Sequence, residues 1–181
     1  MNRPAPNPVS EPQAYQRALL DLLGDDDPAA VQAETPAVLK SLIAEAGSRL
    51  RERPQPGEWS VLELAGHLAD AELVVGARYR WVLAHDNPPL LGYDQDLWVE
   101  RLAHNQDDPA ELLALFNGLR RANLALWERT PQDDRSRAGL HAERGPESFE
   151  LMFRLLAGHD RFHLNQMRKT LAQLTASAAR S

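Results

Sequence analysis

Two of the six histidines, His159 and His163, lie four positions apart near the C-terminal end of the chain. On an α-helix this spacing brings both imidazoles to one face, one turn apart, where they could bind a single metal ion. The pair alone is weak evidence, because random placement of six histidines would produce such a spacing roughly one time in six. The interpretation therefore depends on the residues around the pair.

The apolar stripes that carry the histidines strengthen the metal interpretation. Steps of three and four along the C-terminal segment give Met152, Leu156, His159, His163, Met167 and Leu174. A second stripe of the same kind contains Leu64, His67, Leu68, Ala71 and Val74. Three imidazoles in one core are costly unless each has a partner, and a divalent cation accepts a lone pair from every one of them.

An alternative interpretation is that each histidine is an ordinary core residue with a carbonyl or carboxylate partner. Neutral histidines crowded in one core would compete for such partners, which favours the metal. Three nitrogen ligands leave at least one coordination position for water, which is typical of catalytic rather than structural ions. Zinc and nickel both suit imidazole, and the ligand set does not distinguish between them.

The segments that must position these histidines show helical periodicity and no strand-like alternation. The sequence predicts helices over residues 14–23, from Thr35-Pro36 to Pro54, from Ser60 to the Pro88-Pro89 pair, from Asp108 to 129 and over 148–176, with a short helix near 96–103. Ser60 and Glu63 form the pattern of a capping box, and Asp108 followed by Pro109 is a second start signal.

Long helices with one apolar stripe each must bury those stripes against one another, so the predicted fold is an all-α helical bundle. Residues 1–12 contain four prolines and are expected to form a flexible arm. The bundle domain is expected to cover residues 13–177, with a tail at 178–181.

Composition excludes several classes of protein. The chain has 181 residues, of which 43% are hydrophobic and 25% charged, which is typical of a globular domain. The absence of cysteine excludes disulfides, thiolate zinc sites and a cysteine nucleophile. A net charge of −6 argues against nucleic acid as a partner, and no apolar run is long enough to cross a membrane. The first twenty residues lack the apolar core of a signal peptide, so we expect a cytoplasmic protein.

Four further residues are weaker candidates for a role in the site. Asp160 could accept a hydrogen bond from a ligand imidazole, or it could be a solvated charge on the helix. Arg78 lies three turns beyond His67 on nearly the same face and could meet an anionic substrate group, although a snorkelling surface arginine is favoured. His141 could reach the site as an acid or base, although a loop histidine is favoured. Glu72 points away from His67 and is interpreted as structural.

The remaining histidines and aromatic residues are interpreted mainly as structural. His85 and His104 lie beside helix ends, where a positive charge interacts favourably with the helix dipole, and we assign them no role. Trp59 is interpreted as a core residue beside a helix cap. Tyr93 and Trp98 could form a lid over the site, although core packing is favoured.

The sequence resembles the DinB-like (DinB/YfiT) metalloenzyme family over residues 15–175. The resemblance lies in the segments Pro-Gly-Glu-Trp-Ser-Val at 56–61, Gly-His-Leu-Ala-Asp-Ala-Glu at 66–72, Gly-Pro-Glu-Ser-Phe at 145–149 and His-Asp-Arg-Phe-His-Leu-Asn-Gln at 159–166. It implies a four-helix bundle of up-down-down-up type, here with short extra helices. It also implies a divalent metal ion bound by His67, His159 and His163.

The resemblance implies a reaction as well, because the family includes transferases that use bacillithiol or mycothiol. We therefore expect an enzyme that uses zinc or nickel to transfer a low-molecular-weight thiol to a small electrophile. The alternatives are a metal-dependent hydrolase of a small substrate, a non-catalytic protein that binds a metal or small ligand, and a purely structural bundle. No catalytic residue is identified. A homodimer is one expectation for a bundle with spare apolar helix faces.

Overall fold

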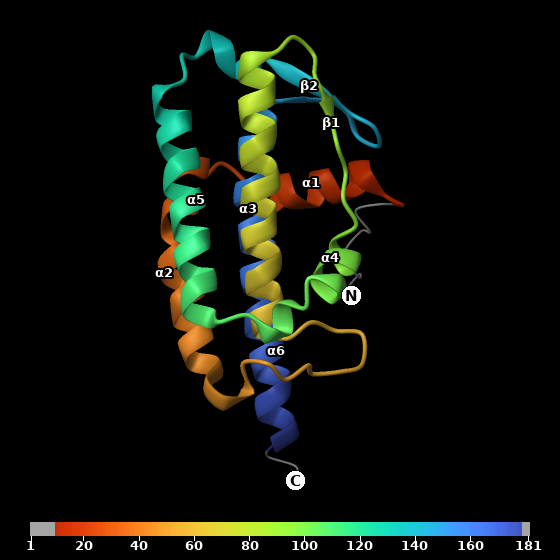
Figure 1. Cartoon of the computed structure of the whole chain (residues 1–181), viewed down its shortest axis with the longest axis vertical. Coiled ribbons are helices and arrows are strands. Elements are labelled where there is room, and N and C mark those ends of the chain that lie inside the picture. The colour runs from red at the N-terminus through yellow and green to blue at the C-terminus, as the bar shows by residue number, and fades with distance from the viewer. Residues whose placement is uncertain (1–9, 179–181) are drawn as a thin grey trace.

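The computed structural model describes residues 10–178, and this part of the chain is mostly helical (Figure 1). Its bundle consists of four long helices: α2 (Pro28–Ala46), α3 (Val61–Ala84), α5 (Pro109–Arg129) and α6 (Phe149–Ala178). Helices α3 and α5 run in one direction and α2 and α6 in the other, which is the up-down-down-up order (Figure 1). The predicted four-helix bundle is therefore confirmed.

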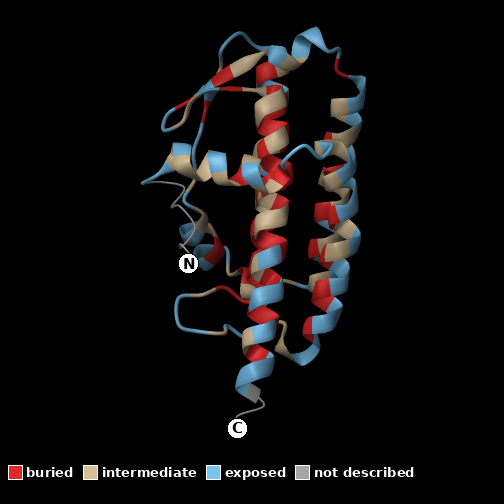
Figure 2. Cartoon of the chain, turned by 180° about the vertical axis from the view of Figure 1, so that it is seen from behind, coloured by how far each residue is buried: buried red, intermediate tan, exposed pale blue. Residues whose placement is uncertain are grey.

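The shorter elements lie around this bundle. Helix α1 (Pro12–Leu23) crosses α6 at a steep angle, and α4 (Gln95–Arg101) precedes α5 (Figures 1 and 2). Single 3₁₀ turns occur at η1 (Gly47–Arg49), η2 (His104–Gln106) and η3 (Asp133–Ser136). The expected arm falls largely on residues 1–9, and most of the expected tail on 179–181, which lie outside the described residues.

A small sheet lies beside the upper end of α3, where no strand was predicted (Figure 1). Its strands are β1 (Pro89–Leu90), β2 (Ala138–His141) and β3 (Gly145–Ser148). They are arranged in the order β1-β2-β3, with β1 parallel and β3 antiparallel to β2. Strands of two to four residues are too short to show an alternating pattern, which explains why the sequence analysis missed them.

The close crossing of α1 over α6 requires a glycine. A Cβ atom on Gly158 would lie 2.1 Å from the carbonyl oxygen of Leu19, much closer than two such atoms can approach. The missing side chain therefore lets α1 pack directly on α6, immediately before His159. Figure 2 shows that α6 is buried over much of this upper part and becomes exposed toward its C-terminal end.

The predicted start signals of α3 and α5 are confirmed. The Ser60 hydroxyl accepts a hydrogen bond from the Glu63 backbone N–H at 3.2 Å, and the Glu63 carboxylate accepts one from the Ser60 N–H at 2.8 Å. Asp108 accepts hydrogen bonds from the N–H groups of Ala110 and Glu111. These contacts satisfy backbone donors that have no partner within the helix.

Helix α2 corrects the prediction that a helix starts after Pro36. The helix begins at Pro28, where the Asp27 carboxylate accepts a hydrogen bond from the Ala29 N–H at 3.0 Å, and it continues through Pro36 to Ala46 rather than Pro54. Proline has no N–H, so Pro36 leaves the Gln32 carbonyl without its helical partner. The guanidinium of Arg120 donates a hydrogen bond to that carbonyl at 2.9 Å.

Arg120 is also the centre of a buried ion network that joins all four long helices. Its guanidinium pairs with Glu72 of α3 at 2.9 Å and with both carboxylate oxygens of Asp160 of α6. Asp160 accepts a further hydrogen bond from Thr35 of α2, and Glu72 accepts one from Asn123 of α5. Each of these charged side chains is essentially inaccessible to water.

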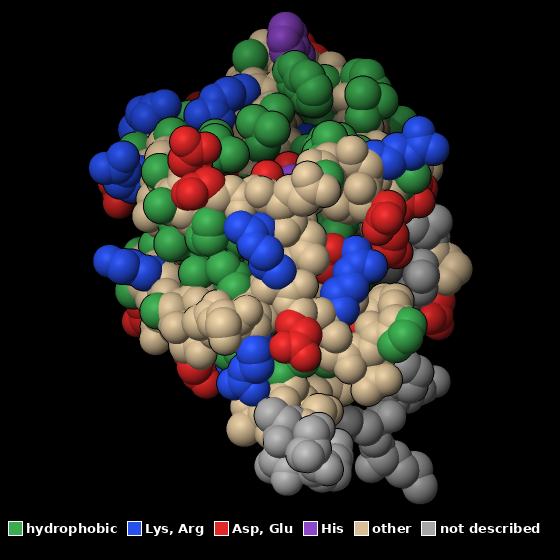
Figure 3. Space-filling model, turned by 60° about the horizontal axis from the view of Figure 1, so that its bottom comes forward, with side chains coloured by type: hydrophobic (Ala, Val, Ile, Leu, Met, Phe, Trp, Pro, Cys, Tyr) green, Lys and Arg blue, Asp and Glu red, His purple; other side chains and the backbone are tan. Residues whose placement is uncertain are grey.

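The surface contrasts with this core. Acidic and basic side chains are interspersed over the lower face of the bundle (Figure 3). Among the described residues, no helix combines the length and the apolar character that a membrane span requires.

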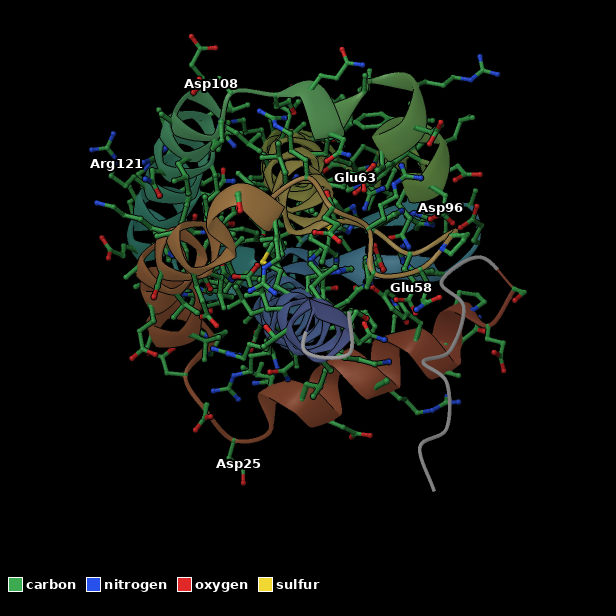
Figure 4. All side chains as sticks on the ribbon, turned by 90° about the horizontal axis from the view of Figure 1, so that it is seen from below. Asp25, Glu58, Glu63, Asp96, Asp108 and Arg121 are labelled. Atoms are coloured by element: carbon green, nitrogen blue, oxygen red, sulfur yellow. The ribbon has the colours of Figure 1, made fainter. Side chains whose placement is uncertain are left out.

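The ion network makes Arg120 a sensitive test of the fold. Replacement of Arg120 by alanine leaves Glu72, Asp160 and the Gln32 carbonyl buried without their main partner. We expect the free energy of unfolding, measured in urea, to fall by about 3–5 kcal/mol. The control is Arg121→Ala, because Arg121 is exposed and points away from the bundle (Figure 4), and we expect a change within about 0.5 kcal/mol. Equal losses in both variants would contradict the assigned role.

Candidate metal centre

The three histidines singled out in the sequence meet between α3 and α6. The Nε2 atom of His67 lies 3.0 Å from Nε2 of His159 and 3.1 Å from Nε2 of His163. One ligand atom from each ring lies within 4.8 Å of the other two. The antiparallel arrangement of α3 and α6 brings His67 level with the pair on α6, so segments about ninety residues apart form one cluster.

These rings cannot satisfy one another. A neutral imidazole has a single N–H, so Nε2 of His67 can donate to only one of the two nitrogen atoms that face it. Burial lowers the pKa of His67 and His159 well below the usual value and that of His163 to about 4, so all three rings are neutral at pH 7. Within the described structure, Nδ1 of His67 and of His159 also has no hydrogen-bond partner. Converging neutral nitrogen donors fit a divalent cation.

Two neighbours hold the His163 ring in place. Gln166 lies one turn further along α6, and its Oε1 atom is 3.0 Å from Nδ1 of His163. When this Nδ1 donates the hydrogen bond, Nε2 keeps its lone pair toward the centre of the cluster. The Trp59 ring stacks on His163 and also contacts His67, with ring centroids 5.1 Å apart in the second pair. Sequence reasoning did not assign a role to Gln166, although its i+3 spacing from His163 was a usable signal.

A cavity of about 430 Å³ opens beside His159, the only one of the three rings that is not fully buried. Its walls come from α1, α3, α6, the segment that leads into α4, and the turn between β2 and β3. The surface combines apolar side chains with the guanidinium groups of Arg78 and Arg144. A small molecule in this cavity would therefore lie next to the histidine cluster.

Arg78 does not occupy the surface position that was favoured from the sequence. Its side chain is 5% exposed and lines the cavity, and it donates a hydrogen bond to the Leu91 carbonyl. His141 lies at the end of β2 rather than in a loop, where it is buried with Nε2 3.5 Å from the Arg78 guanidinium. Burial, and after it the charge of Arg144, lowers the pKa of His141. The side chain of His141 is not part of the cavity wall.

Neither interpretation of Asp160 is correct. Its carboxylate accepts hydrogen bonds from Arg120 and Thr35 and is fully buried, so it neither contacts an imidazole nor faces solvent. Glu72 is structural, as predicted, because it belongs to the same network. Tyr93 packs against Trp98 with ring centroids 4.5 Å apart and also lines the cavity.

His104 has a structural role that the sequence analysis did not assign. Its two ring nitrogens lie 2.7 Å from Asp70 Oδ2 and 2.8 Å from Asp107 Oδ2, and the hydrogen bond with Asp70 is the main cause of its raised pKa. The ring packs against Gly66, where a Cβ atom would lie 2.4 Å from His104 Cγ. Gly66 thus lets the segment before α5 dock beside the histidine cluster. His85, by contrast, is exposed at the C-terminal end of α3.

Fold and site together define a helical-bundle protein with a buried three-histidine centre of the kind that binds divalent metals. The sequence profile described as the DinB superfamily matches residues 29–167, which is most of the chain. The chain therefore belongs to the DinB superfamily.

Relatives of known name support this assignment. A protein of Oceanobacillus iheyensis named "Putative metal-dependent hydrolase" is 26% identical over 133 residues, covering 72% of this chain and 76% of the relative. YfiT of Bacillus subtilis, which has the same type of name, is 30% identical over 112 residues, covering 61% of this chain and 62% of YfiT.

A solved structure shows the same fold. It is described as YfiT from Bacillus subtilis, "a probable metal-dependent hydrolase with an unusual four-helix bundle topology". The structural match covers 97% of this chain and 93% of that chain, with a TM-score of 0.74 and 21% sequence identity.

The raised pKa of His104 predicts a specific dependence of stability on pH. Because its pKa is higher in the folded than in the unfolded chain, His104 stabilises the fold fully below the unfolded value of about 6.5, and this contribution is lost as the pH rises through the folded pKa. We expect His104→Gln to lose more free energy of unfolding at pH 5.5 than at pH 9, measured in urea with a chelator present. His85→Gln is the control. A loss for His104→Gln that is independent of pH would contradict the prediction.

Proposed function

We propose that this protein is a metal-dependent enzyme in which Nε2 of His67, His159 and His163 binds a divalent cation, zinc or nickel. The observation that carries the proposal is the convergence of these three neutral nitrogens at the edge of a cavity large enough for a small molecule. When bound, such a cation would lower the pKa of a coordinated thiol or water and so generate a nucleophile at neutral pH.

The reaction proposed first is transfer of a low-molecular-weight thiol to a small electrophile. The chain contains no cysteine, so the thiol must come from a cosubstrate. Apolar side chains such as Leu19, Val75 and Leu156 line the cavity and would exclude water from the reacting groups. A sulfur–carbon bond would form as the leaving group departs with its electron pair and the thiol proton is released.

Hydrolysis of a small substrate is the second candidate, and the names of the relatives favour it. The same cavity and the same histidines would serve, with water in place of the thiol. A non-catalytic metal-binding protein and a structural bundle are the remaining alternatives. A homodimer, a cytoplasmic location and the lack of a nucleic-acid partner remain predictions from sequence.

Metal content tests the first part of the proposal. We expect tag-free protein, purified after supplementation with zinc, nickel or manganese, to contain close to one ion per chain by elemental analysis. His67→Ala and His163→Ala remove ligands and should lose the ion, whereas His85→Ala removes an exposed histidine and should keep it. Wild-type protein without metal, or His67→Ala with full occupancy, would contradict the proposed centre.

Turnover tests the reaction. Metal-loaded protein is incubated with monobromobimane and a panel of low-molecular-weight thiols, and separately with small esters and amides without thiol. We expect thiol conjugation that depends on both the ion and the thiol, and that is absent in His67→Ala. Hydrolysis without thiol would select the second candidate, and no turnover of either kind would favour the non-catalytic alternative.

A further inference from the structure

The cavity has two chemically different ends, which are defined by one face of α3. His67, Ala71, Val75 and Arg78 follow one another at steps of four, four and three residues, so they lie along one side of the helix. The helical rise of 1.5 Å per residue separates the first from the last by roughly 16 Å along the axis. A histidine of the cluster therefore marks one end of this face and a guanidinium the other.

Helix α6 supplies the opposite wall in the reverse order. Met152, Leu155 and Leu156 line the cavity before His159 is reached, and α6 runs antiparallel to α3. Together with Ala71 and Val75, these side chains form an apolar middle section between the histidine end and the Arg78 end. A ligand that spans the cavity must therefore be apolar in its middle.

Arg78 is a buried cation that forms no close ion pair. Among the described residues no carboxylate forms an ion pair with it, and its Nε atom is buried without a hydrogen-bond partner. Arg144, the other guanidinium of the cavity, differs because it forms two hydrogen bonds to Glu147, at 2.6 and 2.9 Å. The charge of Arg144 is thus paired within the protein, whereas the charge of Arg78 is offset only by Glu147 and Glu143 acting over a longer distance.

A carboxylate is the ligand group that best fits these observations. Nη2 of Arg78 already donates to the Leu91 carbonyl, and a carboxylate would accept a charge-assisted hydrogen bond from the rest of the guanidinium and compensate a charge that is costly to bury alone. Asp94, Asp96 and Glu143 also line the cavity and repel every anion, more strongly the more negative charges it carries. The site therefore favours a single negative charge over a polyphosphate.

We propose that the substrate is a small molecule with an apolar middle section and one terminal carboxylate, which Arg78 binds at the end of the cavity remote from the three histidines. This inference rests on the proposed function for the identity of the site, and it names the class of substrate that the site takes. Arg78 is accordingly a residue that determines specificity.

Binding of a simple probe to metal-free protein tests this proposal. Octanoate and octanamide have the same apolar chain and differ in charge, so calorimetric titration of both isolates the contribution of the carboxylate. We expect wild-type protein to bind octanoate at least about tenfold more tightly than octanamide, and more tightly than acetate, which lacks the chain. This comparison needs no variant and is independent of any effect of mutation on folding.

Two arginine variants then locate the binding site of the carboxylate. We expect Arg78→Gln to lose the preference for octanoate. Arg80→Gln should keep it, because Arg80 lies two residues further along α3, is exposed, and bonds to Gly76 and Asn123 rather than lining the cavity. Equal binding of the two probes, failure to bind either, or a preference retained in Arg78→Gln would overturn the proposal.

The binding measurement distinguishes failure of the carboxylate site from failure of the proposed enzyme. Binding by metal-free protein requires neither an ion nor turnover. Metal-loaded protein that shows no turnover but prefers octanoate would contradict the proposed enzyme and support the carboxylate site. Turnover without a preference for octanoate would support the proposed enzyme and contradict the carboxylate site.

Discussion

The burial of three neutral imidazoles at one point is the constraint on which the rest of the structure depends. Their Nε2 atoms face one another at 3.0 and 3.1 Å, and a set of neutral rings has too few N–H groups to pair them all. In water each nitrogen would be solvated, but Trp59 and the surrounding apolar core exclude solvent from His67 and His163. A cation at this point would use all three lone pairs at once, which turns a costly arrangement into a binding site.

The ion network around Arg120 holds the elements that create this arrangement. Asp160 follows His159 directly in α6. Its ion pair with Arg120 joins this part of α6 to α5, and the ion pair of Arg120 with Glu72 joins both to α3. The same guanidinium replaces the helical hydrogen bond that Pro36 removes from Gln32 in α2. One side chain thus connects the four helices and stabilises a proline inside one of them.

Local patterns in the sequence predicted much of the fold and the convergence of the histidines. The apolar stripes, the capping box at Ser60 and the i,i+4 pair at His159 are short-range features, and each was found where expected. Predictions failed where the partner is distant in sequence. The compensation of Pro36 comes from Arg120, 84 positions later, and the burial of Arg78 depends on the segments around Leu91 and His141. Neither contact leaves a pattern in the neighbouring residues.

The central claim is that one cation is bound by three particular nitrogens, and anomalous diffraction from crystals of metal-loaded protein tests it most directly. Data collected on both sides of the absorption edge of the added metal would locate the ion and identify its element. We predict a single strong peak about 2.0–2.1 Å from Nε2 of His67, His159 and His163. A peak at another position, or three imidazoles paired with protein groups or water and no peak between them, would contradict the account.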